Sequence, residues 1–250
     1  MNRDLEEIRR FAVSTLGEMP EVIELIGNFS TEMAREQFRE NSTLYLGRKN
    51  VPNKILALIA MGVSLANGQE KSSMIHFKLA RKFGADPLEI MDALKAAKMA
   101  LMASTLSSMS AIYPVVEKNF PQPVSQEVEK ILNKVKKESG MGFLPENLNA
   151  VSRISFDILN EHLKEKTELL SPYKLDQKFV FLISFAVSIS IRYEECAIVY
   201  LNQFIRFGGT MPEIEDAISI ARFITGNRVL TSAVPILRAM EAMNTGEPSN

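Results

Sequence analysis

The chain has 250 residues, of which 46% are hydrophobic and 24% are charged, and its formal net charge is −1. This composition is typical of a globular protein with a sizeable core. It offers no basic surface for nucleic acid, because lysine and glutamate are scattered along the chain. The only cysteine, Cys196, rules out an intrachain disulfide and favours a cytoplasmic location. The charged stretch of residues 1–10 lacks the apolar core of a signal peptide.

The first predicted element is a helix over residues 55–66. Its apolar residues recur with helical spacing and cover most faces, so we expect this helix at the centre of a domain. The pair Asn67-Gly68 indicates the end of the helix. Further along, Gly84 suits a left-handed helix end, and the Asp-Pro-Leu-Glu run of residues 86–89 predicts a capped start of the next helix.

Residues 99–116 form the longest uncharged stretch. This stretch reaches about membrane-spanning length, but it is rich in serine and includes Pro114, so a buried bundle helix is the better interpretation. Prolines and polar residues predict an extended linker at residues 121–125. Residues 126–138 then predict a charged amphipathic helix, and residues 244–250 predict a disordered tail.

The second half of the chain repeats the first. Residues 175–217 match residues 51–93 at a shift of 124, which places Gly208 on Gly84. A helix, a glycine stop and a capped helix therefore recur in the same order. A repeat of this length indicates two copies of one domain. We predict an all-α tandem duplication, with one domain over residues 1–120 and the other over residues 126–243.

A motif in the first copy points to a family. The run LALIAMGVSLANG, followed by His76 and Gly84, resembles the carboxymuconolactone decarboxylase-like superfamily, which includes the AhpD alkylhydroperoxidases. The resemblance is strong over residues 51–110 and continues over residues 175–235. It implies two AhpD-like helical domains related by a pseudo-twofold axis. It also implies a homo-oligomer built through these domains, either a trimer of tandem chains or a dimer.

Neither copy keeps both cysteines of the family motif. Their positions hold Gln69 and Ser72 in the first copy, and Tyr193 and Cys196 in the second. Peroxide reduction of the AhpD kind needs one thiolate to attack the peroxide and a second thiol to resolve the sulfenic acid as a disulfide. The degenerate Cys-x-x-Cys motif therefore predicts a protein without thiol peroxidase activity.

Two further motif positions distinguish the copies. The histidine of the family is kept as His76, whereas the second copy has Tyr200 at the matching position. The acidic residue of the family's proton relay is replaced by Ala57 in the first copy and by Phe181 in the second. We therefore expect any active pocket to lie in the first copy, with aromatic side chains filling the equivalent place in the second.

The candidate catalytic residues are His76, Glu70 and Ser72. Glu70 matches the glutamate within the family motif, and the helix break before it would let it converge with His76 as an acid–base pair. Ser72 lies one turn before His76, within reach on a helix. The alternatives are that His76 is a buried relic and that Ser72 only caps its helix.

The second copy carries an equivalent set of residues. A buried structural role is favoured for its cysteine, because neighbouring charges would move the thiol pKa in opposite directions. The second-copy equivalents are Glu194, Cys196 and Tyr200.

Two functions are compatible with these patterns. In the first, the protein acts on a small organic acid, with His76 as general acid/base and a lysine as partner for the substrate carboxylate. In the second, it is a non-catalytic scaffold for binding or assembly, a pseudoenzyme with the AhpD-like fold. We expect no cofactor and no metal, because His76 and His162 are the only histidines and no cysteine cluster occurs. The expected partners are a small-molecule ligand and other copies of the chain, with no nucleic acid and no membrane. The candidate lysines are Lys54, Lys71 and Lys78.

Overall fold

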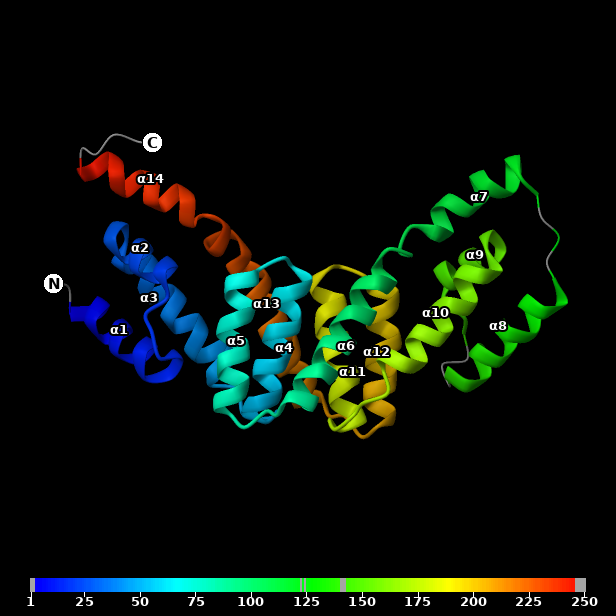
Figure 1. The fold of residues 1–250 in the computed structure, drawn as a ribbon, viewed down its shortest axis with the longest axis horizontal. Helices are drawn as coiled ribbons and strands as arrows, with labels where there is room; N and C mark the ends of the chain where they lie inside the picture. The colour runs from blue at the N-terminus through cyan, green and yellow to red at the C-terminus, as the bar shows by residue number, and fades with distance from the viewer. Residues whose placement is uncertain (1–2, 122, 124, 140–142, 246–250) are drawn as a thin grey trace. The chain divides into compact units, whose positions relative to one another are not determined.

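A computed structural model describes residues 3–121, 123, 125–139 and 143–245 of the chain (Figure 1). Every regular element among the described residues is a helix, and none is a strand. The all-α prediction is therefore confirmed. The predicted tail lies mostly outside the described residues, but residues 244 and 245 belong to the last helix and not to a tail.

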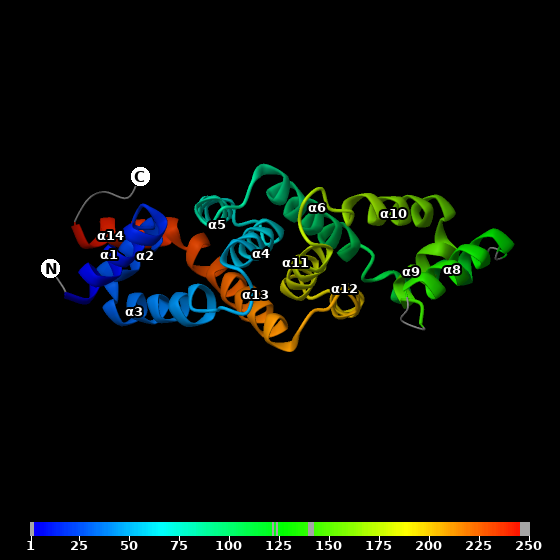
Figure 2. The same cartoon turned by 90° about the horizontal axis from the view of Figure 1, so that it is seen from below.

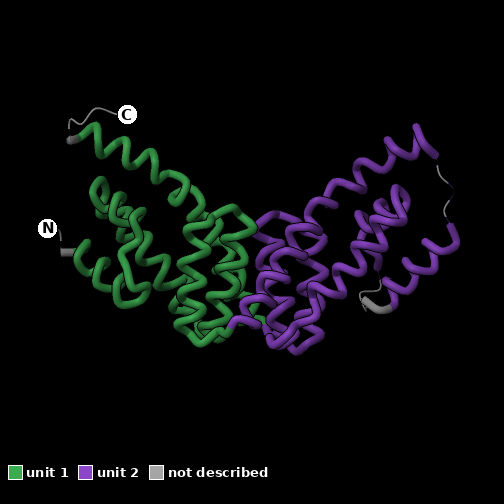
Figure 3. The backbone as a smooth tube through the Cα atoms, viewed as in Figure 1, with its two compact units in different colours: residues 1–86, 211–250 green, residues 87–210 purple. Residues whose placement is uncertain are grey.

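The chain divides into two compact units (Figure 3). Unit 1 consists of residues 1–86 and 211–250. Its core includes Ile8 and Ile26, and Leu230 and Leu237 from the C-terminal part of the chain pack against this cluster. The elements of unit 1 are α1 (Arg3–Leu16), α2 (Glu21–Phe29), α3 (Thr31–Glu40), the π-helix η1 (Asn41–Leu46), α4 (Asn53–Ala66), α5 (Glu70–Lys82), α13 (Met211–Ser232) and α14 (Val234–Thr245).

Unit 2 consists of residues 87–210. Its outer core is built around Leu132, Val151 and Leu159, with Leu106 packed against them. The elements of unit 2 are α6 (Pro87–Ser104), α7 (Met109–Asn119), α8 (Gln126–Ser139), α9 (Glu146–Ile154), α10 (Phe156–Leu169), α11 (Gln177–Ser190) and α12 (Glu194–Arg206).

The helices of the two repeats correspond in order, with α3 and η1 of the first repeat together matching α10 of the second. Helices α4 and α11 have 14 residues each, and α5 and α12 have 13 residues each. Both α4 and α11 are apolar around most of their circumference and are buried in their units, as their sequences predict. Gly84 and Gly208, which follow α5 and α12, have φ of +88° and +82°. The predicted left-handed helix ends are therefore confirmed.

The two compact units differ from the two domains predicted from the sequence, residues 1–120 and 126–243. The repeats meet between α7, which ends at Asn119, and α8, which begins at Gln126. In space, however, α13 of the second repeat packs on α4 and η1, and α6 of the first repeat packs on α11 and α10. Figure 2 shows both helix pairs side by side. Unit 1 therefore takes α13 and α14 from the second repeat, and unit 2 takes α6 and α7 from the first.

Two buried aspartates hold these exchanged helices in place. Asp216 on α13 accepts hydrogen bonds from the backbone N–H groups of Asn50 (2.9 Å) and Val51 (3.2 Å), just before α4. Asp92 on α6 accepts hydrogen bonds of 2.7, 2.8 and 2.9 Å from the N–H groups of residues 173–175, just before α11. A carboxylate is tolerated in a protein interior when several donors replace its water. The exchange is thus specified by one aspartate in each repeat.

The uncharged stretch of residues 99–116 is not the single buried helix predicted from the sequence. Helix α6 ends at Ser104, α7 begins at Met109, and α7 has no buried residue among those described. Consecutive serines in this stretch favour such a break, because their hydroxyls compete for backbone hydrogen bonds. Among the described residues, no single helix is long and apolar enough to cross a membrane. Only α6 and α7 taken together pass that test, and they are bent by 43°.

Candidate functional site

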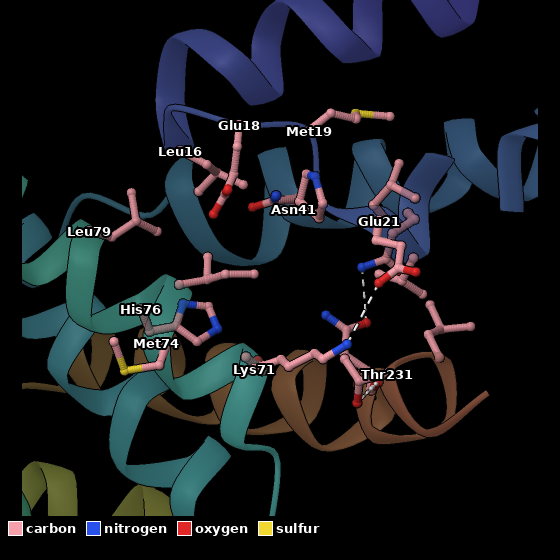
Figure 4. Close-up of a pocket in the computed structure, with 18 of the residues that line it drawn as sticks. Leu16, Glu18, Met19, Glu21, Asn41, Lys71, Met74, His76, Leu79 and Thr231 are labelled. Atoms are coloured by element: carbon pink, nitrogen blue, oxygen red, sulfur yellow. Dashed lines mark hydrogen bonds and ion pairs between the residues drawn. The ribbon is translucent and has the colours of Figure 1, made fainter. Parts of the chain in front are cut away.

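Unit 1 contains a cavity of about 490 Å³. Its walls come mainly from α2, α5, α13, the π-helix η1 and the segment that joins α1 to α2, with single residues from α1, α3 and α14 (Figure 4). This volume lies within the usual range for a small-molecule site. Apolar side chains from these elements make most of the wall, and they include Leu16, Met19, Ile23, Ile75, Leu79, Phe223 and Leu230.

His76 faces this cavity from the middle of α5. Its side chain is buried, and its Nδ1 atom lies 3.1 Å from the hydroxyl oxygen of Tyr45 on η1. The two rings meet edge to face with their centroids 5.3 Å apart. The ring of Phe223 on α13 also packs near Tyr45, with the ring centroids 6.3 Å apart. The imidazole is therefore held in one orientation by a hydrogen bond and by ring packing.

Burial keeps both members of this pair uncharged. Burial lowers the pKa of His76 to about 3 and raises the pKa of Tyr45 well above its usual range. Tyr45 therefore keeps its proton at neutral pH, and His76 is a neutral imidazole. When Tyr45 donates its hydroxyl proton to Nδ1, the imidazole proton resides on Nε2. In that arrangement His76 presents an N–H donor, not a cation, to the cavity.

Neither of the other two candidate residues of the first copy is hydrogen-bonded to His76 in the structure. Ser72 lines the cavity, and its hydroxyl lies 3.1 Å from the hydroxyl of Ser64 on α4. His76 is hydrogen-bonded to Tyr45 and not to Ser72. Glu70 is exposed at the first position of α5 and is not among the residues that line the cavity. The structure therefore brings together His76 and Ser72 but does not bring Glu70 to them.

A polar wall lies on the helices that face α5. Gln37 on α3 donates a hydrogen bond of 2.9 Å to the side-chain oxygen of Asn227 on α13. Thr231, one turn further along α13, bonds to the backbone oxygen of Asn227. Asn41, the first residue of η1, also lines the cavity. Its Oδ1 atom is buried and has no hydrogen-bond partner in the described part of the chain.

Two of the three candidate lysines lie at the edge of the cavity. Lys71 is 3.6 Å from a carboxylate oxygen of Glu21, and Lys78 is 2.8 Å from one of Glu18. These pairs link α5 to the first residue of α2 and to the segment before it. Lys54, at the start of α4, is not among the lining residues. An organic anion entering the cavity would therefore meet Lys71 and Lys78, both already partnered by glutamates.

The equivalent place in unit 2 is a cavity of only about 40 Å³. Cys196 and Tyr200 line it at the positions that match Ser72 and His76. Burial raises the pKa of Cys196 to about 12, and the nearby Lys166 only partly opposes this shift. The remaining second-copy candidate, Glu194, is exposed at the start of α12 and does not line this cavity. Unit 2 thus has space for about one water molecule in place of a ligand.

Several cavity residues were not among those predicted from the sequence. Tyr45 and Asn41 come from η1, and Asn227 and Thr231 come from the C-terminal part of the chain. The only sequence signal for them is a spacing of four residues between polar side chains, which is common on any helix. In the described residues, no group of three or more His, Cys, Asp or Glu side chains is placed to hold a metal ion.

Comparisons with known proteins agree with this architecture. A crystal structure from Burkholderia xenovorans LB400, provisionally described as a gamma-carboxymuconolactone decarboxylase subunit, has the same fold, with a TM-score of 0.81. The match covers 98% of this chain and 100% of that chain at 14% sequence identity. No curated protein matches the sequence. The sequence model of the carboxymuconolactone decarboxylase family matches residues 34–111 and 145–239, which together exceed half of the chain. This protein therefore belongs to the carboxymuconolactone decarboxylase family.

Proposed function

We propose that unit 1 binds a small organic acid in its cavity and acts on it through His76. The observation that carries the proposal is the buried hydrogen bond between Tyr45 and Nδ1 of His76 beside a cavity of about 490 Å³. Family membership supports a lyase-type reaction. The equivalent place in unit 2 has a tyrosine and about 40 Å³ of space, so unit 1 is the functional half.

In this proposal, His76 works first as a neutral hydrogen-bond donor. With Tyr45 donating to Nδ1, the Nε2–H group donates to a carbonyl oxygen of the ligand. When a carboxylate on the carbon next to that carbonyl, or on a carbon conjugated with it, leaves as CO₂, the electron pair of the broken C–C bond moves to the carbonyl oxygen and forms an enolate. The donor matters most at this point, because the negative charge develops on the oxygen that it contacts, beside mostly apolar walls. A proton then adds to the carbon that lost CO₂.

His76 can also serve as the acid or base of this reaction once an anion is bound. Burial alone lowers its pKa, and no acidic partner opposes that shift. A negative charge developing beside Nε2 favours the protonated form and raises the pKa towards neutrality. In this proposal Tyr45, which lies 3.1 Å from Nδ1, orients His76, whereas Glu70, the acid–base partner expected from the sequence, is exposed.

The non-catalytic alternative has its own support. A histidine with a pKa of about 3 is a poor base before ligand binds, and the motif cysteines and relay acid are missing. This alternative predicts that the cavity binds small molecules, if at all, without chemical change.

The test uses carboxymuconolactone and a panel of small dicarboxylates, with binding measured by calorimetry and CO₂ release measured directly. His76→Gln should abolish CO₂ release and weaken binding at least tenfold. His162→Gln, which changes the only other histidine, is the matched control and should leave both unchanged. Binding without turnover would favour the scaffold alternative. Turnover that survives in His76→Gln would contradict the proposal.

A further inference from the structure

The π-helix η1 carries two of the residues that face the cavity. Asn41 and Tyr45 both line it, and η1 spans Asn41–Leu46. A π-helix is rare and occurs most often at functional sites, because the wider turn moves side chains out of α-helical register. The local sequence favours the wider turn, since Ser42 and Thr43 return hydrogen bonds of 2.9 and 2.7 Å to the carbonyl oxygens four residues before them.

A glycine at the end of η1 also has a steric role. A Cβ atom on Gly47 would lie 2.1 Å from the carbonyl oxygen of Ser42, so any larger residue would clash with the π-helical backbone. Unit 2 has no such feature, because α10 continues as an α-helix to Leu169. The position that matches Asn41 there is Lys166, at the repeat shift of 125. The π-turn and its asparagine are therefore specific to the unit with the large cavity.

Asn41 contributes the least satisfied polar group of the cavity wall. Its Oδ1 atom is buried without a hydrogen-bond partner among the described residues. The other two side-chain amides of the wall have a partner, because Gln37 donates a hydrogen bond to Asn227. A buried acceptor without a donor destabilises a fold, so its presence beside a cavity points to a donor that arrives with a ligand.

Resting on the function proposed above, we propose that Asn41 determines specificity by accepting a hydrogen bond from a hydroxyl group of the bound organic acid. At neutral pH a carboxylate has no proton to donate, so the donor must be another group of the ligand. His76 supplies the complementary donor, and Figure 4 shows Asn41 and His76 on different walls of the cavity. The ligand class is therefore a small hydroxy acid, with an acceptor directed to His76 and a hydroxyl directed to Asn41.

The experiment compares pairs of probes that differ only in a hydroxyl, namely malate with succinate and 4-hydroxybenzoate with benzoate. Binding is measured by calorimetry, so the result does not depend on turnover. The native protein should prefer the hydroxylated member of at least one pair by about tenfold or more, the usual effect of a satisfied buried hydrogen bond. Asn41→Leu should abolish that preference and leave the affinity for the other member within about threefold. Asn119→Leu is the matched control, since it makes the same change at an exposed asparagine outside the cavity, and it should keep the preference.

A second readout needs no ligand. Asn41→Leu removes a buried acceptor that has no partner in the fold, so the unfolding midpoint should stay the same or rise. A lower midpoint would show that the amide stabilises the fold and would overturn the assignment. Equal affinity within both pairs, or a preference that persists in Asn41→Leu, would also overturn it. These outcomes are separate from a failure of the proposed function, which is judged by CO₂ release and by His76→Gln.

Discussion

The hydroxyl oxygen of Tyr45 lies 3.1 Å from Nδ1 of His76, and both side chains are buried. Tyr45 reaches this position from a π-helix, whereas His76 comes from α5. This contact orients His76 within the cavity wall. A neutral tyrosine thus holds the imidazole, and it does so without adding a charge to the cavity.

Removing this hydroxyl tests its orienting role. Tyr45→Phe leaves Nδ1 buried without its partner, so we expect the free energy of unfolding to fall by about 1–3 kcal/mol. The imidazole should also lose its single tautomer, which nitrogen NMR of His76 would detect. Tyr113→Phe is the control, because Tyr113 bonds only to Glu117 at the surface, and its effect should stay within about 0.5 kcal/mol. An unchanged tautomer in Tyr45→Phe would show that another group orients His76.

The buried histidine also predicts a pH dependence of stability. In the folded protein the pKa of His76 is about 3, below its ordinary value of 6.5, so between these values the unfolded chain binds more protons. The native state therefore has its full stability above pH 6.5 and loses stability as the pH falls towards 3. For His76 this loss amounts to about 2 kcal/mol at pH 5.

Urea unfolding at pH 7.5 and at pH 5 measures this loss directly. The pKa of His162 is also lowered, to about 4, so it contributes in the same direction. His76→Gln should therefore reduce the difference between the two pH values, and the double change with His162→Gln should reduce it further. A difference that is unaffected by His76→Gln would mean that His76 titrates normally in the folded protein.

The protonated thiol of Cys196 predicts that the protein lacks thiol peroxidase activity. Burial raises its pKa to about 12, so almost none of the thiol is ionised at neutral pH, and the sequence has no second cysteine to resolve a sulfenic acid. We expect a thiol reagent such as dithionitrobenzoate to react slowly with the native protein and rapidly in denaturant. Peroxide consumption driven by a dithiol, and lost in Cys196→Ala, would contradict this prediction.

The buried aspartates predict a stability effect that is shared by both units. Asp216→Ala and Asp92→Ala each leave two or three backbone N–H groups without an acceptor, so each should lower the free energy of unfolding by about 2–4 kcal/mol. Glu161→Ala, which removes an exposed pair with Lys164, should cost less than about 1 kcal/mol. Chemical denaturation compares the three variants. Aspartate variants as stable as Glu161→Ala would show that packing alone holds the exchanged helices.

The sequence by itself determined the helical class, the repeat and the helix ends. Apolar periodicity and glycine positions act over a few residues, so Gly84 and Gly208 end their helices as predicted. The retained His76 likewise pointed to the half of the chain that has the larger cavity. Only the tertiary structure decided which helices share a unit, because the contacts of Asp92 and Asp216 join segments far apart in the chain. Tertiary packing also set Tyr45 against His76, placed Asn41 in the wall of the same cavity and left Glu70 exposed. A side chain's partners depend on neighbouring helices, which the local sequence pattern does not specify.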